Sequence, residues 1–385
     1  MADREVKLLG EVCTIKPPKS EARAKLAGGE VVSFAPMEDL GIGSKYLQPH
    51  RTRRLDEVSG SYTYFADGDV LLAKITPCFE NGKLGVARGL MNGVGFGSSE
   101  YIVLRPAATL DADFLYYYLA RPTFLEEGVR TMTGAVGHKR VTKEFVESYP
   151  IPIPPIAEQR RVVAILDEAF EGIATGKANA EKNLKNAREL FKSYAKDTFL
   201  QGTPRWPAKT LDRIATNLDS KRVPITKGDR KAGEYPYYGA SGIVDYVADY
   251  IFDGETLLIS EDGANLLARS TPIAFPASGR YWVNNHAHIL KFDHMATQRF
   301  VEFFLESIPL DEYITGAAQP KLNQKALNSI SIPLPATVAE QEQVVDQLDS
   351  LAMQSDLLRG TYERKLAALD ELKKSLLHQA FSGAL

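Results

Sequence analysis

The chain has 385 residues, of which 44% are hydrophobic and 25% charged, an ordinary globular composition that predicts two or three domains. Its 46 Lys and Arg against 49 Asp and Glu give a net charge of −3, so DNA binding would require clustered basic residues. Two cysteines, no stretch long enough to span a membrane and no continuous apolar core near the N-terminus favour a cytoplasmic protein without a signal peptide.

The first half begins with a region of short strand-like segments, residues 6–150. Gly68–Ile75 and Tyr101–Leu104 are β-branched and aromatic runs interrupted by Gly, Pro and Asn, which is typical of strands. Asp113–Ala120 predicts a short helix with aromatic residues on one face. Together these segments predict a compact α/β domain with long loops.

A long helix is expected after the Pro-rich segment Ile151–Pro155. Between Val162 and Thr198 apolar residues recur at alternating steps of three and four, which places one apolar stripe along a helix. Such a helix would be about 65 Å long at ~1.5 Å per residue. Gly172 and Gly176 weaken it, and we expect a bend or break there.

The second half repeats these signals in the same order. Glu255–Ser260 and Ala287–Phe292 predict strands, and Gln298–Glu306 predicts the short helix with aromatic residues. The matched segments of the two halves are DGDVLL (67–72) with DGETLL (253–258), GSSEYIVL (97–104) with VNNHAHIL (283–290), and TGAVGHKRV (133–141) with TGAAQPKLN (315–323). The period of roughly 180–190 residues is too long for a solenoid, so each repeat contains a domain.

A second long helix follows Ile332–Pro335, where Thr337 and Glu340 predict a capping box. Apolar residues between Val344 and Ala380 show the same heptad-like spacing, so the two helices can bury their stripes against each other as in a coiled coil. The second strand-rich region lies between the two helices in sequence, and this favours antiparallel packing.

The sequence therefore predicts the α/β class, with two similar domains joined by two long antiparallel helices in a pseudo-two-fold arrangement. The expected domains are 1–153 and 203–335, and the expected helical spacers are 154–202 and 336–385.

Enzyme motifs are missing: the sequence has no Walker loop, no Gly-x-Ser-x-Gly and no Cys-x-x-Cys. The Gly-rich segment 93–97 lacks the long helix of a nucleotide site, which favours a tight loop between strands. His286 and His288 share one face of a predicted strand and His294 is nearby, but a zinc site needs further ligands and a supporting shell. We therefore predict no metal site.

Basic residues gather in Gly-, Asn- and Ser-rich loops of both halves, among tyrosines. Loop Lys and Arg neutralise phosphates, and Asn, Ser and Arg reach base edges. Solvated loop charge is the alternative for each single residue, whereas the set favours DNA. The candidate DNA-binding residues are Arg51, Arg53, Arg54, Lys74, Asn81, Lys83, Ser98, Lys139, Arg140, Lys221, Arg222, Tyr238, Ser241, Arg269, Asn284, Asn285 and Lys321.

Two loops start with the same three residues, at Thr133–Ala135 and Thr315–Ala317, and reach a basic residue at Lys139 or Lys321. One interpretation is a turn that joins the domain to its helix. The other is a site where backbone amides and the lysine meet a phosphate backbone. The sequence leaves both open.

The whole layout resembles the specificity subunit of type I restriction–modification systems. The segments that carry this resemblance are IPIPP…AEQRRVV and IPLP…AEQEQVV at the helix starts, LKKSLLHQAFSG (372–383) with its echo LFKSYAKDTFLQG (190–202), KITPCFENGK (74–83) and YPYYGASGI (235–243). Their order covers nearly the whole chain.

The resemblance implies a non-catalytic subunit for host defence. Two target-recognition domains would each read one half of a bipartite site in double-stranded DNA, and the helices would set the spacing and dock two methyltransferase subunits. Restriction subunits would join them. S-adenosylmethionine, ATP and Mg²⁺ would belong to these partners, with no cofactor in this chain.

Several alternatives stay open. One alternative is a standalone nuclease or methyltransferase with duplicated DNA-binding domains. A second is a coiled-coil adaptor that binds protein and not DNA. A third is a specificity subunit that serves a methyltransferase–nuclease fusion in place of a separate restriction subunit. The candidate partner-facing residues on the helices are charged (Arg160, Arg161, Glu168, Glu340, Glu342, Asp346) and apolar (Ile165, Phe170, Phe199, Phe381).

Overall fold

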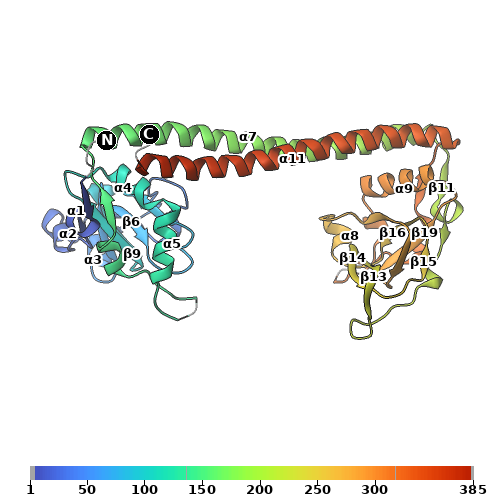
Figure 1. The fold of residues 1–385 in the computed structure, drawn as a ribbon, viewed down its shortest axis with the longest axis horizontal. Coiled ribbons are helices and arrows are strands. Elements are labelled where there is room, and N and C mark those ends of the chain that lie inside the picture. Colours follow the sequence, from blue (N-terminus) through green and yellow to red (C-terminus); the bar gives the residue numbers. More distant parts are fainter. Residues whose placement is uncertain (1–4, 136, 317, 383–385) are drawn as a thin grey trace. The chain divides into compact units, whose positions relative to one another are not determined.

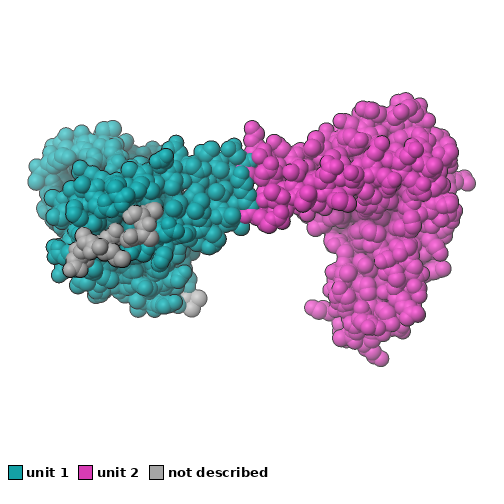
Figure 2. Space-filling view, turned by 45° about the horizontal axis from the view of Figure 1, so that its top comes forward, with its two compact units in different colours: residues 1–179, 365–385 teal, residues 180–364 magenta. Residues whose placement is uncertain are grey.

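The computed structural model describes residues 5–135, 137–316 and 318–382; Val136, Ala317 and Gly383 of the sequence motifs lie outside these ranges. The chain divides into two compact units, Met1–Asn179 with Lys365–Leu385, and Ala180–Arg364 (Figure 2). Each unit contains one strand-rich domain and the adjoining parts of both long helices (Figure 1).

The first domain is built on two four-stranded sheets and a short two-stranded one. The sheets are β2 (Cys13–Ile15), β9 (Tyr101–Pro106), β6 (Val70–Ala73) and β7 (Leu84–Val86); β4 (Arg51–Arg54), β3 (Val31–Ala35), β8 (Val94–Gly97) and β5 (Thr63–Ala66); and β1 (Val6–Leu8) with β10 (Pro150–Pro152). The helices are α1 (Leu9–Val12), α2 (Ser20–Lys25), α3 (Leu55–Val58), α4 (Ala112–Leu119), α5 (Pro122–Thr131) and α6 (Lys143–Glu147).

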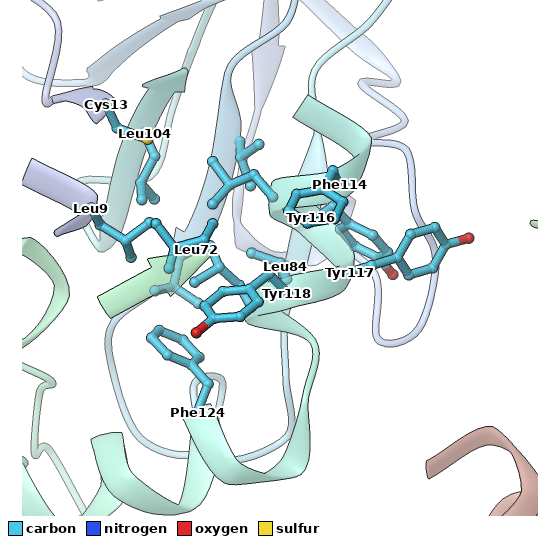
Figure 3. Packing of buried hydrophobic residues seen from close by; sticks show 14 of the residues in the cluster. Leu9, Cys13, Leu72, Leu84, Leu104, Phe114, Tyr116, Tyr117, Tyr118 and Phe124 are labelled. Carbon is cyan, nitrogen blue, oxygen red and sulfur yellow. The ribbon is translucent and has the colours of Figure 1, made fainter. Parts of the chain in front are cut away.

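Helix α4 confirms the predicted short aromatic helix and forms much of the core. The Asp111 carboxylate caps its start by accepting hydrogen bonds from the amides of Asp113 and Phe114. From Asp113 to Leu119 every side chain is buried. Its aromatic rings pack against leucines of the sheet, including Leu72 and Leu84 (Figure 3).

The second domain repeats this architecture. Its sheets are β12 (Thr216–Asn217), β19 (Ala287–Lys291), β16 (Thr256–Ser260) and β17 (Ala274–Ala277); β14 (Gly242–Val247), β13 (Ala232–Gly239), β18 (Arg280–Val283) and β15 (Phe252–Asp253); and β11 (Ala208–Thr210) with β20 (Ser331–Pro333). Its helices are α8 (Asn265–Ala268), α9 (Met295–Ser307) and α10 (Gln324–Ser329). The predicted strands and the aromatic helix of this half are confirmed.

Strand register corrects one detail of the predicted repeat. In the central strands Ala73 lies opposite Tyr101, whereas Ser260 lies opposite Ala287. Val70 therefore corresponds to Leu257 and not to Thr256, so the match of DGDVLL with DGETLL slips by one residue. The buried leucines of both strands keep their places in the sheet, because the hydrophobic pattern helps to set the register.

The two long helices are α7 (Ile156–Gly202) and α11 (Val338–Ser382). They run antiparallel where they meet within each unit. In the first unit Lys177 Nζ lies 2.7 Å from Asp370 Oδ1, and in the second Ser355 Oγ donates to the Ala187 carbonyl at 2.9 Å. The break expected at the glycines is wrong, because α7 is continuous. A Cβ on Gly176 would lie 3.4 Å from Leu369 Cδ1, so this glycine lies at the close approach of the helices.

A buried glutamine joins each domain to the start of its long helix, a role that the sequence analysis did not assign. The side-chain amide of Gln159 donates to the carbonyls of Thr109 and Pro154, and its oxygen accepts from the Asp111 amide, all at 2.8 Å. Gln341 is also buried. It donates to the Pro335 carbonyl at 2.9 Å and accepts from a threonine hydroxyl of α9 at 2.6 Å.

The start of α11 carries half of the predicted capping box. The Thr337 hydroxyl accepts from the Glu340 amide at 3.2 Å, as expected. The Glu340 carboxylate accepts from the indole of Trp206 at 3.0 Å, and so ties this helix to the segment after α7.

The expectation that three aromatic residues of the helices are exposed for a partner is wrong. Phe199 is 2% exposed and its ring meets Phe300 at 5.2 Å. Phe170 and Phe381 pack on the core of the first domain, since the domain covers this side of the helices. Among the described helices, none combines the length and apolar character that crossing a membrane requires.

Candidate nucleic-acid interface

In the first domain a glycine loop, residues 133–140, closes against the end of the central strand β6. Thr133 and Arg140 exchange two backbone hydrogen bonds of 3.0 and 2.8 Å, and the Val141 amide donates to the Lys74 carbonyl at 2.9 Å. Gly134 has φ of 124°, and a Cβ there would lie 2.9 Å from a carbonyl oxygen across the loop. The loop therefore requires glycine at this place.

The second domain builds the same loop, residues 315–321, at the end of β16. Thr315 and Lys321 exchange hydrogen bonds of 2.9 and 2.8 Å, and the Leu322 amide donates to the Glu261 carbonyl at 2.8 Å. Gly316 has φ of 86°, and a Cβ there would lie 2.4 Å from a carbonyl oxygen. We call these two places the strand-end sites. Each loop is a closed turn anchored to a buried strand and facing solvent.

The strand-end site of the first domain carries an exposed ion pair. The Arg140 guanidinium binds both carboxylate oxygens of Glu100 at 2.9 Å, and this lowers the pKa of Glu100. The Lys74 ammonium donates to the Ser99 carbonyl at 3.0 Å. Lys139 is exposed beside them. Sequence-predicted basic residues from two separated segments therefore meet here.

At the strand-end site of the second domain the charges are more buried. Lys321 Nζ lies 3.1 Å and Arg222 Nη1 2.6 Å from the Glu261 carboxylate. Burial alone would raise the pKa of Glu261, but the hydrogen bond from Arg222 and the charges of His288 and Lys321 hold it below the usual range.

His288, at the base of this site, is fully buried and both ring nitrogens face oxygen atoms. Nδ1 lies 2.5 Å from Asp219 Oδ2, and Nε2 lies 2.7 Å from the Leu322 carbonyl. These two contacts hold the ring in a fixed orientation inside the second domain. His286 pairs separately with Asp262 at 2.8 Å. Within the described ranges no group of three or more His, Cys, Asp and Glu is placed to hold a metal ion.

The other candidate residues of the first domain lie on several surfaces. Arg51, Arg53 and Arg54 form the exposed edge strand β4. Asn81 is exposed, whereas the Lys83 ammonium donates to a backbone carbonyl at 2.9 Å. Ser98 lies in the turn that leads into β9, where its hydroxyl accepts from the Glu100 amide.

In the second domain some candidates are bonded inside the protein. The Arg269 guanidinium donates to the carbonyls of Leu305 and Ile308, and so closes the end of α9. The Asn284 side chain is buried and accepts from the His286 amide. Tyr238 packs its ring on the domain core. Lys221, Ser241 and Asn285 are exposed.

Comparison with known proteins matches this arrangement to one family. The family model described as the type I restriction modification DNA specificity domain covers residues 1–185 and 205–364. The chain belongs to this family. The predicted resemblance to specificity subunits is thereby confirmed, as is the expected fold of two α/β recognition domains with two long helices.

Relatives in the family share parts of the sequence. The specificity subunit of the EcoEI type I restriction enzyme of Escherichia coli is 40% identical over 157 residues, covering 40% of this chain and 26% of that protein. A putative specificity subunit of Haemophilus influenzae is 35% identical over 184 residues, or 43% of this chain and 47% of that protein. These alignments therefore span between a quarter and half of the relatives' lengths.

Solved structures show the same fold. A chain from a structure of the assembly and conformational transition of a type I R-M system covers all of this chain with a TM-score of 0.81 at 17% identity. The HsdS subunit of Thermoanaerobacter tengcongensis covers all of it with a TM-score of 0.68 at 17% identity.

Proposed function

We propose that this chain is the DNA sequence-specificity subunit of a type I restriction–modification complex. Each recognition domain reads one half of a bipartite site, and the long helices set the distance between the halves. One observation carries this most: both domains hold a glycine loop on the same strand end, yet the side chains there differ, Lys74 and Arg140 against Glu261 and Lys321. Two similar frames with different polar surfaces suit two different half-sites.

The exposed candidates at the strand-end sites are the contacts in this proposal. Lys139, Arg140 and Lys321 lie next to phosphates, and Asn285 reaches base edges. Arg222 and Arg269 act through the loops that they hold in place, because their guanidinium groups are bonded within the domain.

The long helices are the proposed docking surface for two methyltransferase subunits. Met353 and Leu357, one turn apart on α11, are 72% and 68% exposed in the second unit. Exposed apolar side chains in such a stripe are typical of an interface that a partner covers. In this proposal the chain is cytoplasmic and catalyses nothing itself. S-adenosylmethionine serves the methyltransferase subunits, and ATP and Mg²⁺ serve the restriction subunits.

Domain exchange with methylome sequencing tests the proposal. Residues 208–331 are replaced by the same region of another family member, and the methylated sites of cells carrying each version are determined. We expect one half-site to change and the other to stay the same, with an unchanged spacer. A reciprocal exchange of residues 6–150 is the matched control and should change the opposite half. If both halves change in each exchange, or no methylation depends on the chain, the proposal is wrong.

A further inference from the structure

A basic cleft lies beside the strand-end site of the first domain. It has a volume of about 510 Å³ and lies between the segment after β2, strand β5 and the glycine loop. Its lining contains five cations, Lys16, Lys19, Lys74, Arg140 and Lys143, against one carboxylate, Glu144. The cleft is therefore positive, although the chain as a whole is slightly acidic.

The positive charge of the cleft is only partly neutralised. Arg140 and Lys143 have carboxylate partners, Glu100 and Glu147. Lys16, Lys19 and Arg23 have no ion pair among the described residues. Burial and the nearby charges of Lys16 and Arg23 lower the pKa of Lys19, as expected for crowded cations without a counter-ion. These three cations therefore have no carboxylate partner among the described residues and are available to bind an anionic ligand.

Local backbone geometry fixes the position of Lys16 in the lining of the cleft. Strand β2 ends at Ile15, and the Lys16 amide donates to the Val103 carbonyl at 2.8 Å. Lys16 has φ of 59°, in the left-handed region that a lysine rarely adopts. The prolines at positions 17 and 18 restrict the chain directly after it. Lys19 follows, and its ammonium donates to the Gly60 carbonyl at 2.7 Å.

Three tyrosines also line the cleft, Tyr62, Tyr64 and Tyr101. Tyr64 and Tyr101 are buried, and the hydroxyl of Tyr101 donates to the Pro36 carbonyl at 2.8 Å, so only Tyr62 has a partly exposed ring. Five cations from separate segments suit a sugar–phosphate chain, which carries several phosphates, better than a single small anion.

We propose that this cleft holds the DNA backbone beside the first half-site, with Lys16 and Lys19 on phosphate oxygens. The inference rests on the proposed function and adds two residues that the sequence analysis did not single out. Because phosphates are the same at every base pair, these lysines provide affinity and positioning without sequence preference.

The test uses the full chain in complex with its methyltransferase subunits. Lys16→Gly suits the left-handed backbone, and Lys19→Gln removes the charge but keeps a side chain that can donate a hydrogen bond, so both should fold. Lys25→Gln is the matched control, because Lys25 is exposed on α2, which follows Lys19 directly, but does not line the cleft. DNA affinity is measured for the methylated site and for a version with an altered first half-site, from roughly 50 to 200 mM salt.

Each cleft variant should bind both DNAs about tenfold more weakly. The negative slope of log K against log salt should become shallower by about one, because one phosphate contact is lost. The ratio between the two DNAs should stay at the wild-type value, and the control should match wild type. Wild-type binding and slope in both cleft variants would overturn the inference, as would a changed ratio. A wild-type complex with no preference between the two DNAs would instead reject the proposed function.

Discussion

The two strand-end sites share a backbone and differ in side chains. In both domains the first and last residues of a glycine loop exchange two backbone hydrogen bonds. The next amide donates a third hydrogen bond to a carbonyl at the end of the central strand. These bonds involve only backbone atoms. The first site then carries the exposed pair Glu100–Arg140, whereas the second carries the buried group of Asp219, Glu261 and His288. The frame thus tolerates opposite charges at corresponding positions, as two different half-sites require.

The difference has an energetic consequence. An exposed ion pair contributes little because water screens it, whereas breaking a buried charged group leaves a charge without a partner. The charged residues at the strand-end site of the second domain should therefore stabilise the fold. Replacing those of the first should change the free energy of unfolding little.

The largest expected effect is on the stability of the second domain. Asp219→Ala removes the partner of His288 and the acceptor of the Ile289 amide, which lie 2.5 and 2.9 Å from its oxygens. We expect a loss of about 3–5 kcal/mol in the free energy of unfolding. Urea unfolding followed by domain-specific fluorescence measures it. Glu100→Gln in the first domain is the control and should cost much less; equal losses would break the comparison.

Acid should affect the same group. Burial would raise the pKa of Asp219, but hydrogen bonds from His288 and the Ile289 amide outweigh it and hold the pKa below the usual range. A carboxylate with a lowered folded pKa stabilises the fold above its unfolded pKa of about 4, and this contribution disappears as the pH falls through the folded value. The free energy of unfolding is measured at a series of pH values from 6 downward. It should decrease once the pH is below about 4, and Asp219→Asn should make this decrease smaller. An unchanged pH profile in the variant would contradict it.

A smaller effect is expected at the buried glutamines. Gln159 makes three hydrogen bonds inside its unit and Gln341 makes two. Replacement by Leu leaves the partner groups of the glutamine unpaired, at a cost of about 1–3 kcal/mol. Gln159→Leu should cost more than Gln341→Leu in urea unfolding. Because each glutamine holds one domain on its helix, each variant should lose methylation of the half-site read by that domain before it loses methylation of the other half-site. The reverse order of stability would contradict this comparison.

The sequence was sufficient for the repeat, the two long helices, the two aromatic helices and four of the strands, because these follow from local periodicity and order. It placed Arg51, Arg53 and Arg54 in a loop, whereas they form strand β4. It was not sufficient for the partners of polar side chains. Arg222 and Arg269 were predicted as DNA-binding loop residues, but their guanidinium groups have acceptors far along the chain, at Glu261 and at the end of α9. Gln159 was not singled out in the sequence, because its burial depends on the loop that precedes α4, which is about 50 residues away in the chain.

The smallest expected effect compares two glycines of α7 within the first unit. Both cost helix propensity, by about 1 kcal/mol relative to Ala. A Cβ at Gly172 would meet nothing within 4 Å, whereas one at Gly176 would lie 3.4 Å from Leu369 of the neighbouring helix. Gly172→Ala should therefore stabilise the protein by about 1 kcal/mol, and Gly176→Ala by slightly more, because its methyl group adds a van der Waals contact with Leu369. Thermal unfolding of the two variants measures the difference, with Leu369→Ala in the Gly176→Ala background as the control that removes the contact. If Gly176→Ala stabilised the protein less than Gly172→Ala, α7 and α11 would approach too closely at this point for an added side chain.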